Sequence, residues 1–82
     1  MRRQRMTIRV ITDEFLRSQR MNKYKYEVIS ARSEFRGCVD VIYSEQGIHL
    51  SAGHTYYVQV SAEPYRPRVV KMFREIIPGE RT

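Results

Sequence analysis

The chain has 82 residues, is 41% hydrophobic, and has a formal net charge of +6 from 15 Lys and Arg against nine Asp and Glu. This length predicts one domain with a small core, and the hydrophobic content excludes a fully disordered chain. The single cysteine, Cys38, excludes an intramolecular disulfide and is typical of the reducing cytoplasm. Because the apolar runs are short, we expect neither a membrane span nor a secretory signal.

The positive charge is concentrated at the start of the chain. Residues 1–25 contain eight basic and two acidic side chains, whereas residues 26–82 contain seven of each. Such a concentration attracts a polyanion or an acidic protein surface. We expect residues 1–6 to form a flexible basic arm and residues 7–82 to form a single domain. If translation started at Met21 instead, the basic segment would be missing.

The first elements of the domain are predicted to be a strand and a short helix. Residues 7–12 alternate and are rich in β-branched side chains, so Ile8 and Val10 are expected to face inward on a strand. Thr12 has the character of a helix N-cap, and acids followed by arginines suit the two ends of a helix dipole. Residues 13–20 are therefore predicted to form a helix of about two turns.

Alternating strands are predicted through the middle of the chain. The clearest covers residues 23–30, with Tyr24 and Tyr26 on one face and Lys23 and Lys25 on the other. Further expected elements are strands over residues 36–43, 48–50 and 55–61 and a hairpin turn over residues 44–47.

The last segment, residues 68–77, has two competing interpretations. Its apolar side chains recur at i, i+3, i+4 and i+7, which favours a helix. Alternatively, it could be a strand that pairs with residues 55–61 and closes the sheet. The predicted class is α+β: a small antiparallel β-meander of about four to five strands, able to close into a barrel, with a short N-terminal helix and a C-terminal helix.

The residues do not indicate catalysis. His49, His54 and Cys38 lack the paired spacing of a zinc site, and no nucleophile or phosphate-loop motif is present. We therefore expect a non-enzymatic protein without metal or cofactor. In composition the chain also resembles small, basic mRNA-cleaving toxins, but their two longer helices are not predicted here.

Arg- and Tyr-rich segments supply the candidate binding residues. Tyrosines that alternate with lysines could stack on unpaired bases if their face is open, or could simply form the core if it is buried. A second aromatic and basic group is expected near the proline-rich turn. The candidate nucleic-acid-binding residues are Arg2, Arg3, Arg5, Arg9, Arg17, Arg20, Lys23, Lys25, Tyr24, Tyr26, Tyr57, Arg66 and Arg68.

Two functions are compatible with this composition. The first is a small nucleic-acid-binding regulator in the cytoplasm. The second is a protein-interaction module, such as a phage-type accessory protein that docks on and inhibits a host enzyme, because Tyr and Arg also suit protein interfaces. Tyr, Arg and Lys gathered on one face would favour nucleic acid, whereas an apolar patch with the charges elsewhere would favour protein. A homodimer is compatible with either function.

Overall fold

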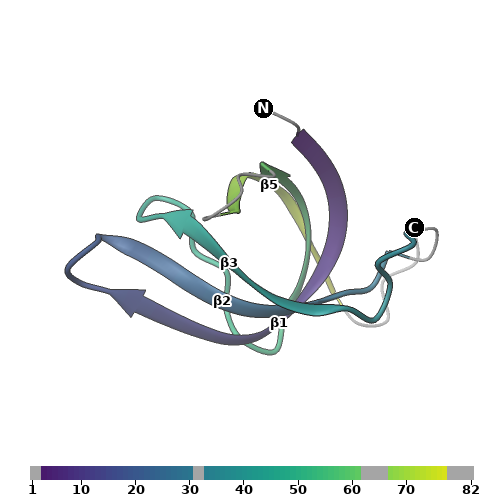
Figure 1. Ribbon diagram of the computed structural model, residues 1–82, viewed down its shortest axis with the longest axis horizontal. Helices are drawn as coiled ribbons and strands as arrows, with labels where there is room; N and C mark the ends of the chain where they lie inside the picture. Colours follow the sequence, from purple (N-terminus) through teal and green to yellow (C-terminus); the bar gives the residue numbers. More distant parts are fainter. Residues whose placement is uncertain (1–2, 31–32, 62–66, 78–82) are drawn as a thin grey trace.

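The computed structural model describes residues 3–30, 33–61 and 67–77, and in this part of the chain five strands form a closed barrel (Figure 1). In chain order the strands are β1 (Arg3–Leu16), β2 (Met21–Val28), β3 (Val39–Glu45), β4 (Thr55–Ser61) and β5 (Arg68–Ile76). Around the barrel their order is β1-β2-β3-β5-β4, and β4 pairs back onto β1. All neighbours are antiparallel except β3 and β5, which are parallel over two residue pairs.

Strand β1 takes part in two pairings. Its first part, through Arg9, pairs with β4, and its second part, from Ile8 to Leu16, pairs with β2. An extra residue, Ile11, forms a β-bulge where β1 leaves β4 and continues along β2. Bulges bend a strand. Beyond the bulge, the β1–β2 hairpin projects from one side of the barrel (Figure 1).

The inward side chains of all five strands form the core. Alternate residues of β2 and β4 are buried, as expected for strands with one face toward the barrel interior. One more core residue, Leu50, comes from the β3–β4 connection. The core residues are Met6, Ile8, Val10, Tyr24, Tyr26, Val28, Ile42, Leu50, Tyr56, Val58, Val60 and Val69.

A buried polar network attaches the β3–β4 connection to the barrel. The carbonyl of Ile48 accepts hydrogen bonds from Asn22 Nδ2 at 2.8 Å, Ser44 Oγ at 2.8 Å and Tyr24 Oη at 3.1 Å. Tyr24 Oη also lies 2.7 Å from Ser44 Oγ and accepts a hydrogen bond from the Leu50 N–H at 3.2 Å. Buried hydroxyl and amide groups are costly unless hydrogen-bonded. The network therefore holds β2 and the connection in one arrangement.

The predicted N-terminal helix is wrong. Residues 13–16 belong to β1 and residues 17–20 form the hairpin turn. A two-turn helix leaves much of its backbone without intrahelical hydrogen bonds, whereas pairing with β2 provides partners for this segment. Residues 3–6 of the expected arm also lie in β1, paired with β4. A chain starting at Met21 would lack this strand and its contribution to the core.

The predicted C-terminal helix over residues 68–77 is also wrong, because this segment is the strand β5, and the alternative of a strand that pairs with residues 55–61 is confirmed. Pairing with β4 and β3 closes the barrel and removes exposed strand edges. Val70 and Phe73 are extra residues at two β-bulges. Each bulge shifts the inward and outward alternation by one residue. The apolar residues Val69, Met72 and Phe73 consequently imitate the helical spacing i, i+3, i+4.

The fold class is therefore all-β rather than α+β, although the barrel-like sheet was predicted. The strand over residues 55–61 is confirmed as β4, but residues 48–50 belong to an irregular connection. The sheet also departs from a simple meander, because β3 lies beside β5. The predicted proline-rich turn falls mainly outside the described residues. No helix among the described residues could cross a membrane.

Candidate functional site

Two groups of outward-facing side chains combine aromatic and basic residues on the barrel. The first, here called the hairpin–sheet face, lies on the β1–β2 turn and the outer surface of β2, β3 and the start of β5. It consists of Arg17, Arg20, Lys23, Lys25, Val41, Tyr43 and Arg68.

Strand register arranges the sheet part of this face. Lys23 of β2 is opposite Tyr43 of β3, and Tyr43 is in turn beside Arg68 of β5. Lys25 is opposite Val41 one step along the same pair of strands. Residues that are directly opposite one another project on the same side of a sheet. The half-buried Tyr43 ring is thus placed between a lysine and an arginine.

The turn part of the face carries two exposed arginines, Arg17 and Arg20. The turn is closed by a hydrogen bond from the Arg20 N–H to the Arg17 carbonyl at 3.3 Å. Arg20 has a φ of 51°, in the left-handed region that non-glycine residues rarely adopt. Neither arginine forms an ion pair with another described residue, and the same is true of Lys23 and Lys25. These four cations are thus not held in ion pairs, although Glu14 of β1 is opposite Lys23 in the β1–β2 register.

Three other predicted site residues have different surroundings. Arg9 forms a hydrogen-bonded ion pair with Glu27 across the β1–β2 ladder, which offsets its charge. Tyr24 and Tyr26 lie in the core, so they do not form an open stacking surface. Burial is the main cause of the raised pKa of Tyr26, and the nearby Asp40 and Cys38 raise it further.

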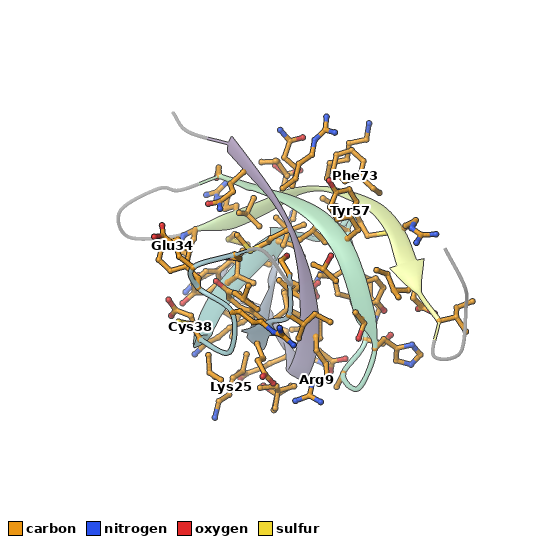
Figure 2. The ribbon with its side chains drawn as sticks, turned by 90° about the vertical axis from the view of Figure 1, so that its right-hand side faces the viewer. Arg9, Lys25, Glu34, Cys38, Tyr57 and Phe73 are labelled. Carbon is orange, nitrogen blue, oxygen red and sulfur yellow. The ribbon has the colours of Figure 1, made fainter. Side chains whose placement is uncertain are left out.

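The second group, here called the Phe73 cluster, comprises Arg5, Tyr57, Lys71 and Phe73. The ring centroids of Tyr57 and Phe73 are 5.3 Å apart, with the planes tilted by 35°. The Arg5 guanidinium carbon lies 4.9 Å from the Phe73 ring centroid, and Lys71 Nζ lies 5.3 Å from it. Figure 2 shows Tyr57 and Phe73 side by side on the outside of β4 and β5, far from Lys25. This arrangement allows the two cations to interact with the face of the ring.

Sequence reasoning included Arg5 and Tyr57 among the site residues but missed Lys71 and Phe73. The reason is the incorrect helix. Residues two apart lie on different faces of a helix but on the same face of a strand. If the segment had been interpreted as a strand, the i, i+2 pair of a lysine and a phenylalanine would have indicated a shared surface.

The other predicted site residues are either partly buried or lie wholly or partly outside the described part of the chain. Arg68 is half-buried, and its Nε has no hydrogen-bond partner among the described residues. Arg2 and Arg66 lie outside the described residues, and Arg3 is described only as a backbone position of β1. His54 pairs with Glu75 at 3.2 Å, and the described part of the chain contains no cluster of three or more potential metal-ligating side chains.

Comparisons with known proteins add no assignment. No protein-family model matches the chain, and neither the curated proteins nor the solved structures gave a significant match. The interpretation of both surfaces therefore depends on their residues and geometry.

Proposed function

We propose that this protein is a non-enzymatic nucleic-acid-binding protein whose hairpin–sheet face contacts the phosphate backbone. The observation that carries the proposal is the set of unpaired cations on this face. Arg17, Arg20, Lys23 and Lys25 lie on one hairpin, and none forms an ion pair with another described residue. Arginine and lysine groups that are not neutralised by acids can replace the counterions of a phosphate backbone.

The architecture supports the same conclusion. Five-stranded barrels of the oligonucleotide- and oligosaccharide-binding type bind ligands on the face of strands 2 and 3 and with the loop between strands 1 and 2. The hairpin–sheet face occupies the corresponding places on this five-stranded barrel. Because a fold alone does not imply a function, the architecture adds support only in combination with these side chains.

The distribution of apolar residues favours nucleic acid over a protein partner. Tyr43 lies beside Lys23 and Arg68, so aromatic and basic groups share one surface. In the described part of the chain, the exposed large hydrophobic residues are distributed over several elements: Ile11, Phe15, Phe35, Val39, Met72 and Ile77. A surface that combines Tyr43 with basic residues, without a single apolar patch, is therefore closer to the surface expected for binding nucleic acid than to the one expected for binding protein. A regulatory role and a cytoplasmic location belong to this proposal.

Fluorescence anisotropy with single-stranded DNA, duplex DNA and RNA tests the proposal. For each ligand, the logarithm of the affinity should fall with the logarithm of the salt concentration, by about 0.7–0.9 per phosphate contact. The Lys23→Gln/Lys25→Gln variant should reduce this slope. Arg36→Gln is the control, because Arg36 is an exposed arginine of the β2–β3 connection, outside the proposed face.

Two outcomes would overturn the proposal. One is the absence of salt-dependent binding to any of the three nucleic acids, which would favour a protein partner. The other is an equal loss per charge removed in the Arg36→Gln control, because net charge rather than this face would then explain the binding.

A further inference from the structure

The Phe73 cluster has the composition of a base-binding surface but lies outside the hairpin–sheet face. Its aromatic rings are on β4 and β5, and its cations come from β1 and β5. We infer that this cluster stacks unpaired bases and that the ligand of this protein is a single-stranded nucleic acid. The inference depends on the proposed function and specifies its ligand class.

The strand register of β4 and β5 explains how the rings come together outside the barrel. Tyr57 projects outward because its neighbours Tyr56 and Val58 are buried. In the β4–β5 register Tyr57 is opposite Arg74, and Phe73 is the extra residue between Arg74 and Met72. Phe73 lies two residues after the outward-facing Lys71, so its ring projects on the same side and packs against Tyr57. Because of the bulge, Arg74 follows Phe73 opposite Tyr57 without an inward-facing residue between them.

Two cations beside the ring make the cluster suitable for a nucleotide. Arg5 of β1 is opposite Gln59 of β4, and Gln59 is opposite Lys71 of β5, so one row across three strands has a cation at each end. Both cations reach the Phe73 ring. A nucleotide presents an aromatic base together with a phosphate anion. When a base stacks on these rings, Arg5 and Lys71 move from the Phe73 ring to the phosphates of the nucleotide.

Stacking on this surface requires bases that are not already stacked. In a duplex each base is enclosed by its neighbours and its partner strand, so its aromatic face cannot reach a ring on the outside of a barrel. In a single strand every base has an accessible aromatic face, and stacking on protein aromatics tolerates any sequence. The cluster therefore selects for single strands without selecting for base identity.

Strand β1 connects the two surfaces. Figure 2 shows β1 running from the region of Tyr57 and Phe73 to the region of Arg9 and Lys25. Arg5 lies at the first region, and Thr12 is opposite Lys25 at the second. At about 3.3 Å per residue, the β1 positions of these two regions are separated by roughly 23 Å. One strand of nucleic acid could follow β1 and contact both surfaces.

A fluorescent reporter at the cluster tests the inference directly. The protein contains no tryptophan, so Phe73→Trp introduces a single indole at the proposed stacking position. A thymidine oligonucleotide of about 16 nucleotides, the upper end of the site size for one such barrel, should quench this fluorescence. Inorganic polyphosphate, which lacks bases, should not quench it. In the matched Phe35→Trp control, on an exposed position outside both surfaces, the oligonucleotide should leave the fluorescence unchanged.

A second variant measures the contribution of the ring to affinity. Phe73→Leu keeps an apolar side chain but removes the aromatic face. It should weaken binding to the thymidine oligonucleotide by about 5- to 150-fold, the equivalent of stacking one base, and should leave duplex binding unchanged. Tyr57→Phe keeps both rings and should bind like the unmodified protein. Circular dichroism of each variant verifies that the barrel is folded.

The possible failures can be distinguished. If the unmodified protein binds no nucleic acid, the proposed function and this inference both fail. If binding depends on Lys23 and Lys25 but Phe73→Leu has no effect and Phe73→Trp is not quenched, only this inference fails. Equal quenching by polyphosphate and by the oligonucleotide would also overturn it, because bases would not then be required.

Discussion

The hairpin–sheet face and the Phe73 cluster both combine basic and aromatic residues, but they are assembled differently. The first takes Arg17, Arg20, Lys23 and Lys25 from one continuous hairpin, so its charge is visible as a local pattern. The second takes its four residues from β1, β4 and β5. The comparison shows that concentrated charge can be located in a sequence, whereas a surface built from rings of separate strands depends on which strands pair.

The largest effects on single-strand affinity are expected from removing the charges of the hairpin–sheet face and from removing the Phe73 ring. Replacing Arg17, Arg20, Lys23 and Lys25 by Gln should lower single-strand affinity roughly 10²- to 10³-fold at low salt and reduce the salt slope by up to about 2.8. Phe73→Leu should lower affinity by about 5- to 150-fold, and by the same factor at every salt concentration, because stacking releases no counterions. Anisotropy titrations from low to high salt measure both. A reduced salt slope in Phe73→Leu would show that the two surfaces do not differ in this way.

A smaller effect is expected from the support beneath the hairpin–sheet face. Tyr24→Phe removes the hydroxyl that accepts the Leu50 N–H and contacts Ser44, and should lower the free energy of unfolding by about 1–3 kcal/mol. Tyr43→Phe removes a hydroxyl from an outward-facing ring and should change it by less than about 0.5 kcal/mol. Urea denaturation measures both variants. Equal losses would mean that the buried network contributes no special stability.

Changes in the β1–β2 turn should separate stability from binding. Arg20→Gly removes the side-chain strain of the positive φ and should stabilise the protein by about 1 kcal/mol. It also removes one charge and should reduce the single-strand salt slope by about 0.7. Arg17→Gly removes a charge from a residue without a positive φ, so binding should weaken with no gain in stability. Thermal unfolding and anisotropy together test the pair, and a stability gain in Arg17→Gly would contradict the role of strain.

The smallest effect is expected at high pH. Because the pKa of Tyr26 is raised above its ordinary value of 10.0, the folded barrel holds this proton more tightly than the unfolded chain. The corresponding stability is fully present below about pH 10 and is lost as the pH rises through the folded-state pKa. Tyr26→Phe should lose less stability over this range. Thermal unfolding between neutral and alkaline pH measures the difference, and identical profiles would contradict this role for Tyr26.

The sequence by itself determined the features that depend on neighbouring residues. Alternation in β2 and β4 separated the two faces of each strand, with Tyr24 and Tyr26 together on one face of β2, although it left open whether that face is buried. It could do so because a strand has a period of two residues, and burial of one face leaves that period in the sequence. The position of the excess charge was equally clear, although the element that carries it was predicted incorrectly.

Only the tertiary structure decided the elements whose conformation depends on distant partners. Residues 13–16 are a strand because β2 pairs with them, and β5 is a strand because β3 and β4 require it to close the barrel. The bulges at Val70 and Phe73 removed the period of two that would have identified β5. The Phe73 cluster was hidden for the same reason: a β-bulge and a three-strand register are properties of pairing between segments, and neither leaves a periodic signal within one segment.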